Sequence, residues 1–327
     1  MEKVLVTGAR GFIGSQLCKR LVASGVELHA VSRRQPADVM AWWQLIGGDA
    51  DGAACAAAIR WWNVDLVDLQ ATRELIRTVR PDVTYHLASL VMGSRSLEMV
   101  LPILQNNFLT TFNLLLATAE NRAGRLVLAG SLEEPDHSYP EPSSPYAAAK
   151  GAASQYARMF QALYQTEVVM TKISMVYGPA QADLTKLVPY VTTAFLRGVQ
   201  PSLSSGLRLV DWIFVDDVVD GLIACAHASG ADGRTVDLGA GEVLSIREVV
   251  QQLRELIPGA PEPLFGAVPD RPLERVRKTD IAASLKLTGW SPSTTLQAGL
   301  RRTVDWYKSR PAAWANDGEG APDRLSG

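Results

Sequence analysis

Cysteine is scarce in this sequence: Cys18, Cys55 and Cys225 are the three among 327 residues. Three widely separated cysteines cannot all pair, and they lack the closely spaced pairs that hold structural zinc, so neither a disulfide framework nor a zinc site is predicted. The four histidines are equally dispersed and have no ligand spacing, so we assign no metal. This cysteine usage is typical of a reducing compartment, and we predict a cytoplasmic protein.

Long apolar runs and an excess of charge of either sign are also missing. No run approaches the roughly 18 apolar residues of a membrane-spanning helix. The N-terminal MEKVLVTGAR has no apolar core followed by a cleavage site, so we expect neither membrane insertion nor secretion. The formal net charge of −2 gives no general attraction to polyanions, which makes nucleic acid an unexpected partner.

The first half of the chain alternates short β-forming runs with amphipathic helical stretches. Strands are expected at residues 4–6, 28–31, 83–87, 125–129 and 167–173. Helices are expected from Phe12 up to Gly25, and at residues 71–79, 101–119 and 146–164. Repeated βα units predict an α/β fold with a Rossmann-type, doubly wound parallel sheet.

Beyond Tyr177 the alternation loosens into short pieces broken by proline and glycine. The predicted divisions are a dinucleotide-binding domain at residues 1–176, a smaller mixed α/β substrate domain at 177–308 and a flexible tail at 309–327. Two segments within 211–240, at 212–215 and 235–238, are expected to return to the main sheet. Residues 36–60 fit no neat element and are interpreted as a long excursion after the second strand.

Three glycines, Gly8, Gly11 and Gly14, stand between the first strand and the first helix. Without β-carbons the backbone can approach a pyrophosphate closely, and the helix N-terminus offers unpaired N–H groups to it. The alternative interpretation is that these glycines only form a tight turn. The order of strand, glycines, helix and second strand favours dinucleotide binding instead.

The second strand is followed by Ser32, Arg33 and Arg34, where a carboxylate would be expected to hold a ribose 2′-hydroxyl. Two guanidinium groups can donate charge-assisted hydrogen bonds to a 2′-phosphate. We therefore favour NADP over NAD as the cofactor. The alternative is a solvated basic turn.

Tyr146 and Lys150 are four residues apart in the Ala-rich helix, so their side chains lie on one face. A lysine cation near a phenol favours the phenolate, which can exchange a proton with a sugar hydroxyl or carbonyl. Ser131, at the carboxyl end of the preceding strand, is placed to hydrogen-bond the same oxygen. We predict that these three residues are catalytic.

Taken together in this order, the motifs of the chain resemble one known group, the extended short-chain dehydrogenase/reductases of the nucleotide-sugar epimerase/dehydratase family. The resemblance covers about residues 3–308. It rests on TGARGFIG at 7–14, VDL at 64–66, HLAS at 86–89, NNFLTTFNLL at 106–115, Ser131 with Tyr146 and Lys150, VYGP at 176–179, DWIFVDDVVDG at 211–221 and GWSPSTTLQAGL at 289–300.

The resemblance implies roles for individual residues. Tyr146 would be the acid/base, Lys150 would hold the nicotinamide ribose and Ser131 would fix the sugar oxygen. The implied cofactor-binding residues are Gly8, Arg10, Gly11, Phe12, Ile13, Gly14, Ser32, Arg33, Arg34, Asp65, Leu66, Leu87, Ala88, Ser89, Asn107, Tyr146, Lys150 and Ile173. The implied substrate-binding residues are Met175, Leu187, Val188, Arg208 and Arg271, and the implied substrate is a nucleotide-diphosphate sugar.

Two positions depart from the family pattern. Met175 stands where members usually have an asparagine, and Val210 stands where they usually have an arginine that contacts substrate phosphate. Arg208 is a candidate substitute for that arginine, because alternate residues of a strand share a face. The opposing interpretation is that Arg208 is a surface charge.

The sequence identifies the reaction less closely than it identifies the resembling family. Glu133 stands in the register of the glutamate that removes a proton in the 4,6-dehydratases, but decarboxylases and some reductases share it. The arginine pair favours a net reductase that draws on NADPH, so we predict reduction of a nucleotide-linked 4-keto-6-deoxyhexose. The alternatives are a 4,6-dehydratase or a 4-epimerase with an internally recycled cofactor, and a non-catalytic NADP-binding sensor.

The helices at 101–119 and 146–164 resemble the pair through which family members dimerise. We therefore expect a homodimer.

Overall fold

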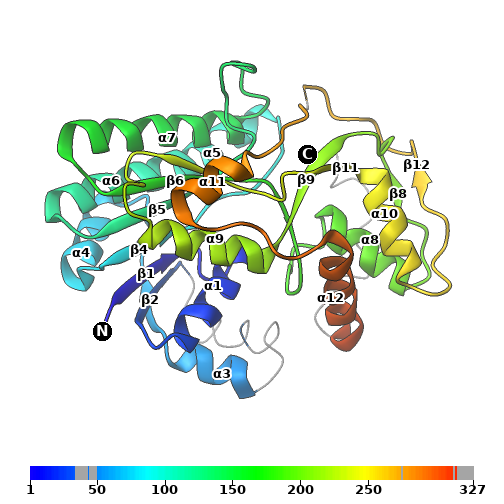
Figure 1. Ribbon diagram of the computed structural model, residues 1–327, viewed down its shortest axis with the longest axis horizontal. Coiled ribbons are helices and arrows are strands. Elements are labelled where there is room, and N and C mark those ends of the chain that lie inside the picture. Colours follow the sequence, from blue (N-terminus) through cyan, green and yellow to red (C-terminus); the bar gives the residue numbers. More distant parts are fainter. Residues whose placement is uncertain (34–42, 44–49, 274, 312–313, 315–327) are drawn as a thin grey trace.

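The computed structural model describes residues 1–33, 43, 50–273, 275–311 and 314, with the side chains of 50–53 excepted. Arg34, most of the 36–60 stretch before residue 50 and nearly all of the predicted tail lie outside this description. Figure 1 shows a large sheet flanked by helices and, beside it, a smaller part that carries α8, α10 and α12.

The large sheet has seven parallel strands in the order β10-β6-β5-β4-β1-β2-β3. The strands are β1 (Lys3–Thr7), β2 (Glu27–Ser32), β3 (Arg60–Asn63), β4 (Val83–His86), β5 (Arg125–Ser131), β6 (Val168–Ile173) and β10 (Thr235–Leu238). The order reverses between β1 and β4, and this reversal opens a crevice at the carboxyl edge of the sheet. The predicted Rossmann-type, doubly wound sheet is confirmed.

Helices cover both faces of the large sheet. One layer contains α1 (Phe12–Ala23) and α9 (Val215–His227); the other contains α4 (Leu69–Val79), α6 (Thr110–Asn121) and α7 (Pro145–Tyr164) (Figure 1). In β1, Val4 and Val6 are buried on the α1 side, and Leu5 is buried on the α4 side. Strand side chains alternate between faces, so an unbroken apolar run is what a strand covered on both faces requires.

The smaller part has its own core. It contains β7 (Met175–Tyr177), β8 (Ser202–Leu203), β9 (Leu209–Phe214), β11 (Val243–Ser245) and β12 (Leu264–Phe265), with α8 (Leu187–Leu196), α10 (Ile246–Glu255) and α12 (Leu296–Ser309). α11 (Ile281–Thr288) packs against β10 and α9 of the larger part.

One of the two segments expected to return to the large sheet does so. β10 pairs with β6, whereas β9 pairs with β7 and β11 in a separate three-stranded sheet. The reason lies in the alternation of β9: Trp212 and Phe214 enter the core of the smaller part, and Ile213 enters the core of the larger one. The expectation for residues 212–215 was wrong, because a strand buried on both faces can lie between two cores as well as inside the large sheet.

Two further elements differ from expectation. The end of the 36–60 stretch forms α3 (Ala50–Ala57), and Arg60 begins β3, the edge strand that was not predicted. The expected helix at 101–119 is a continuous run of η1 (Leu97–Met99), α5 (Val100–Ile103), the π-helical η2 (Leu104–Leu109) and α6.

This run, Leu97–Asn121, is long and apolar enough to cross a membrane by length and composition, although the sequence alone suggested no such segment. It packs against α4 and α7, and it contains Asn107 and Asn113, both buried and hydrogen-bonded. Those contacts identify it as a core helix of the larger part, with one face left exposed.

Candidate active site

The carboxyl ends of the parallel strands bring the predicted functional residues to one edge of the sheet. β1 ends at Thr7, β2 at Ser32 and β4 at His86. β5 and β6 end side by side, with Ser131 opposite Ile173. Ligands of such sheets bind at this edge, near the point where strand order reverses.

The glycine turn is shaped by close backbone packing. Gly8 has φ +71°, and a β-carbon there would lie 2.6 Å from the Ala88 nitrogen. A β-carbon on Gly14 would collide with the Gly8 carbonyl. Gly11 is the N-cap of α1 and has no side chain to cover the first N–H groups of the helix. The turn therefore fits a pyrophosphate, which needs a close approach and free backbone donors.

A buried polar chain fixes the strand ends on either side of the crevice. His86 Nδ1 lies 2.7 Å from Thr7 Oγ1, and His86 Nε2 lies 3.0 Å from Thr111 Oγ1. Thr7 Oγ1 also accepts a hydrogen bond from the Ala88 backbone N–H. Burial, together with the charge of Lys150, lowers the pKa of His86 to about 3. His86 is thus a neutral structural residue at neutral pH.

The π-helical turn of η2 points Asn107 at the loop after β4. The Asn107 Oδ1 accepts hydrogen bonds from Ser89 Oγ at 3.0 Å and from Leu90 N at 2.6 Å, and its Nδ2 donates to the Leu90 carbonyl. Asn107 therefore holds the Leu87–Ser89 loop in place across from the glycine turn. π-Helical turns are frequent at functional sites.

The remaining predicted cofactor residues lie around the same edge with different exposures. Asp65 closes the turn after β3 by accepting from Val67 N, whereas Leu66 is buried in the core beside α4. Arg33 is exposed and donates to Asn106 Oδ1 at 3.1 Å. In the first turn of α1, Ile13 packs against both cores and Phe12 packs against the core of the smaller part.

Ser131, Tyr146 and Lys150 come together where β5 meets the start of α7. Ser144 caps α7 by accepting from Ala147 N, and Pro145 occupies the first turn, where a missing N–H has no cost. The Ser131 side chain lies close enough to Tyr146 to lower the pKa of its phenol. The Lys150 Nζ donates to the Ala129 carbonyl at 2.7 Å and lies 5.9 Å from the centre of the Tyr146 ring.

Burial shifts the titration of both ionisable members of this trio. Burial raises the pKa of Tyr146 above its usual value, the charge of Glu133 raises it further, and the hydrogen bond with Ser131 opposes the shift. Burial lowers the pKa of Lys150 to about 8, and the charge of Glu134 opposes that change. A lysine with such a pKa is still largely cationic at neutral pH, where it favours the phenolate of Tyr146.

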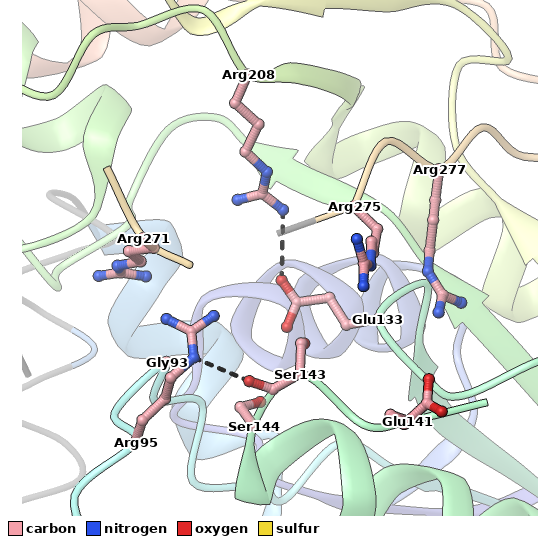
Figure 2. A pocket seen from close by; sticks show the side chains of 10 residues that line it. All are labelled: Gly93, Arg95, Glu133, Glu141, Ser143, Ser144, Arg208, Arg271, Arg275 and Arg277. Carbon is pink, nitrogen blue, oxygen red and sulfur yellow. Dashed lines mark hydrogen bonds and ion pairs between the residues drawn. The ribbon is translucent and has the colours of Figure 1, made fainter. Parts of the chain in front are cut away.

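Glu133 projects from the end of β5 into a pocket walled by arginines (Figure 2). Its Oε1 lies 3.6 Å from Arg208 Nη2, and its side chain is 41% exposed. The other described residues lining this pocket are Gly93, Arg95, Glu141, Ser143, Ser144, Arg271, Arg275 and Arg277. A carboxylate thus stands at the mouth of a strongly cationic pocket, within electrostatic reach of Tyr146.

Of the five predicted substrate residues, the structure brings two to this pocket. Arg208 and Arg271 line it, so Arg208 is not a bare surface charge. Val188 is buried in the core of the smaller part and Leu187 packs against the same core. Met175 is 38% exposed at the start of β7, outside the pocket lining.

Three arginines of this pocket were missed in the sequence. Arg275 and Arg277 are two residues apart, and alternate residues of an extended segment share a side. That spacing could have identified them. Arg95 offered no such signal, because it is brought in by the loop after β4, where its Nε donates to the Ser143 carbonyl at 2.9 Å.

No cluster of three or more histidine, cysteine, aspartate or glutamate side chains that could hold a metal ion occurs within the described ranges.

Comparisons with known proteins agree with this geometry. The sequence pattern of the NAD dependent epimerase/dehydratase family matches residues 4–239. The chain is 30% identical to dTDP-glucose 4,6-dehydratase of Neisseria meningitidis, over 97% of this chain and 96% of the relative. It is also 30% identical to UDP-glucose 4-epimerase of Mycolicibacterium smegmatis, over 94% and 99%.

Solved structures give the same result. UDP-glucose 4-epimerase of Thermus thermophilus in complex with NAD has a TM-score of 0.78 and 26% identity, with 94% of this chain and 99% of that one covered. The Bordetella bronchiseptica enzyme WbmF in complex with NADH has a TM-score of 0.79 and 26% identity, with 95% and 93% covered.

Proposed function

This chain belongs to the NAD dependent epimerase/dehydratase family, and from that premise we propose that it is an enzyme that oxidises and reduces a nucleotide-diphosphate sugar with a recycled nicotinamide cofactor. The favoured reaction is 4,6-dehydration of an NDP-hexose. The observation that carries this choice is Glu133, a carboxylate beside the Ser131–Tyr146 pair and inside the arginine-walled pocket.

The proton chemistry is assigned to this chain's own side chains. Tyr146, as phenolate, accepts the proton of the sugar hydroxyl, and the Ser131 hydroxyl donates to the oxygen that becomes a ketone. Lys150 supplies the positive charge that favours the phenolate. A bound nicotinamide dinucleotide would supply the hydride acceptor, and the residues of the glycine turn and the Leu87–Ser89 loop would hold it.

Glu133 gives the dehydratase its second proton transfer. A ketone acidifies the neighbouring C–H bond, and a carboxylate held at that carbon can remove the proton. The carboxylic acid so formed can pass the proton to the hydroxyl on the next carbon, which leaves as water while the carbon–carbon double bond forms. Arg208 Nη2 lies 3.6 Å from Glu133 Oε1 and can hold this carboxylate in place. A net reductase has no need of such a base, so the predicted keto reduction is less well supported than elimination.

The arginine-walled pocket suits the diphosphate of the substrate. Along the part of its wall that is described, arginines outnumber glutamates five to two. Guanidinium groups bind phosphate oxygens through paired, charge-assisted hydrogen bonds. We propose that the nucleotide-sugar diphosphate binds here, between the large sheet and the smaller part, which then acts as the substrate domain.

The cofactor is a nicotinamide dinucleotide, and we propose a preference for NADP. Ser32 and the exposed Arg33 at the end of β2 support it, because neither supplies a carboxylate that would repel a 2′-phosphate. The two related structures described above are complexes with NADH and with NAD, so NAD is the competing cofactor.

A second candidate function is 4-epimerisation. It is favoured by Leu132, which places an apolar residue between Ser131 and Glu133, where some dehydratases have an aspartate. Epimerisation needs the Tyr146 chemistry but no proton removal from carbon. The two functions therefore differ in their need for Glu133.

The test is to incubate the protein with dTDP-glucose and, separately, with UDP-glucose in deuterated water, with NAD or NADP, and to follow the sugars by NMR. A dehydratase gives a 4-keto-6-deoxy sugar that carries solvent deuterium, and Glu133→Gln abolishes it. An epimerase gives the C4 epimer without solvent deuterium, and Glu133→Gln leaves the rate within a fewfold. If the protein converts only a 4-keto-6-deoxy sugar, with stoichiometric loss of NADPH, it is a reductase. That result would contradict the proposal.

A homodimer is proposed through the exposed face of α5, η2 and α7. The exposed apolar side chains on these elements are Val100, Leu101, Leu104, Tyr156, Leu163 and Tyr164, and Leu97 of η1 precedes them. Exposed apolar side chains on helices that pack together support an interaction surface here.

A further inference from the structure

The adjacent glutamates after β5 enter opposite environments. Glu133 faces the arginine-walled pocket with 41% of its side chain exposed. Glu134 is 3% exposed and lies in the interior, beneath the residues that would carry the reaction. A buried carboxylate is costly unless its charge and its lone pairs are matched, so its surroundings need an explanation.

Both oxygens of Glu134 accept hydrogen bonds. Oε1 accepts from the Ser131 backbone N–H at 2.8 Å, and Oε2 accepts from Ser154 Oγ at 2.7 Å. The Glu134 N–H donates back to the Ser131 carbonyl at 3.1 Å. Glu134 thus closes the turn that sets the position of Ser131, and two accepting oxygens are what an ionised carboxylate presents.

Space for this carboxylate depends on a glycine. A β-carbon on Gly130 would collide with Glu134 Oε1 and with the Thr171 carbonyl. The side chain is therefore held against the last turn of β5 by packing as well as by its hydrogen bonds.

Cations face Glu134 from two elements. Lys150 of α7 and Lys172 of β6 both lower the pKa of Glu134, against a larger rise caused by burial. Arg277 approaches from the segment after residue 274 and donates to the Glu134 carbonyl, with its charge paired to Asp136. Lys150 itself is 3% exposed, and its Nζ donates a hydrogen bond to a neutral group, the Ala129 carbonyl.

We propose that Glu134 is a positioning residue whose buried negative charge keeps Lys150 protonated and whose hydrogen bonds hold Ser131 in register with Tyr146. Its catalytic meaning rests on the proposed function, whereas the charge coupling itself does not. In this arrangement Glu133 acts on the substrate, and Glu134 sets the charge of Lys150.

The charges around Lys150 determine the direction in which its pKa changes when the Glu134 charge is removed. Burial disfavours the cation and Glu134 favours it, so removing the Glu134 charge moves the loss of the Lys150 proton to lower pH. The other titratable groups that face Lys150 are His86, which is neutral at neutral pH, and Tyr146. Neither can replace Glu134 as an anion at neutral pH.

The experiment is an NMR titration of the protein labelled with isotope-enriched lysine, with the Lys150 signal assigned from its absence in Lys150→Met. We expect a wild-type midpoint near 8. In Glu134→Gln, which keeps the shape and loses the charge, we expect the midpoint to fall by about one pH unit. Glu134 also raises the pKa of Tyr146 directly, so the proposal is tested by the Lys150 midpoint and not by turnover.

Glu133→Gln is the matched control, because it makes the same change one residue away. Its Lys150 midpoint should remain at the wild-type value, whatever happens to turnover. An unchanged midpoint in Glu134→Gln would overturn the proposal. This readout needs no substrate, so it separates failure of the charge coupling from failure of the proposed reaction.

A reciprocal measurement keeps the proposal testable if Glu134→Gln does not fold. Coupling between two ionisable groups is mutual, so removing the lysine charge must raise the pKa of Glu134. In Lys150→Met labelled on glutamate, the Glu134 midpoint should therefore rise by about one unit. No change in that midpoint would also overturn the proposal.

Discussion

At the scale of single residues, the site depends on how one side chain sets the charge of the next. Tyr146 cannot act as a base at neutral pH by itself, because burial and Glu133 both raise its pKa. Lys150 supplies the opposing charge, and Glu134 in turn favours the cationic form of Lys150. The chemistry therefore depends on a short relay of charges, each held by a hydrogen bond to the backbone or to a neighbouring side chain.

Tyr146→Phe removes the proton acceptor and leaves the ring in place. We expect turnover of a nucleotide sugar to fall by about 100- to 10,000-fold, the usual contribution of a general acid/base. The cofactor should still bind, because the glycine turn is untouched. The check is sugar turnover by NMR alongside cofactor titration by tryptophan fluorescence, and retention of full turnover would exclude Tyr146 as the acid/base.

Arg33→Ala tests the cofactor preference. Loss of a charge-assisted hydrogen bond to a 2′-phosphate, about 1.5 kcal/mol, should weaken NADP binding by roughly tenfold. NAD lacks that phosphate, so its dissociation constant should not change and serves as the internal control. Calorimetric titration with both cofactors measures the difference, and equal effects on the two would show that Arg33 does not read the phosphate.

At the scale of elements, strand ends and turns place the site. β5 delivers Ser131, the turn after it separates Glu133 from Glu134, and the first turns of α7 deliver Tyr146 and Lys150. On the other side of the crevice, η2 uses Asn107 to hold the loop after β4. The ends of these elements and the turns between them therefore supply the residues of the site.

Much of the site could be predicted, because it depends on short-range patterns in the sequence. The glycine turn, the four-residue spacing of Tyr146 and Lys150 and the strand-end position of Ser131 follow from backbone periodicity. The burial of Glu134 could not be predicted, since neighbouring glutamates look alike until Ser154 and Lys150 are brought in from α7. The π-helical turn was missed for a similar reason: the loop contacts of Asn107 lie far away in sequence.

The polar chain through His86 links β1, β4 and α6 and gives stability a defined pH dependence. The folded pKa, about 3, lies below the unfolded value of about 6.5, so the unfolded chain binds a proton that the folded chain resists. The stabilisation is fully present above pH ~6.5 and is lost as the pH falls toward ~3, by at most about 5 kcal/mol.

Chemical denaturation across this pH range checks the linkage. His86→Gln should be less stable at neutral pH but should lose less stability on acidification than the wild type. His137→Gln, a change at an exposed histidine, should match the wild-type slope. A wild-type slope in His86→Gln would show that His86 does not carry the acid sensitivity.

At the scale of the whole molecule, two cores meet along one crevice. β9 joins them physically, since its alternate side chains enter one core and then the other. The arginine-walled pocket lies along the same boundary, with Arg95 from the larger part and Arg208 beside β9. The family, the sheet and two of the pocket arginines, Arg208 and Arg271, could be predicted from sequence. The pocket as a whole could not, because its arginines come from segments far apart in the chain.

The exposed apolar face of α5, η2 and α7 leads to a prediction about assembly. Leu101 is 59% exposed and Leu163 is 66% exposed on this face. Leu101→Glu with Leu163→Glu should convert a dimer to a monomer, because two charges would be buried in the contact. Sedimentation equilibrium measures the mass.

The control for assembly is Leu207→Glu, at a leucine that is 69% exposed in the smaller part. This variant should remain a dimer. A wild-type protein that sediments as a single chain at all concentrations would contradict the assembly.

The most direct test of the proposed reaction follows the hydride. dTDP-glucose with deuterium at carbon 4 is converted in ordinary water with a catalytic amount of cofactor, and the product is examined by mass spectrometry and NMR. We predict that the deuterium is recovered in the product, at carbon 6 of a 4-keto-6-deoxy sugar, with no net reduction of the cofactor. Deuterium that accumulates in free reduced cofactor, or a product formed without moving it, would contradict the account.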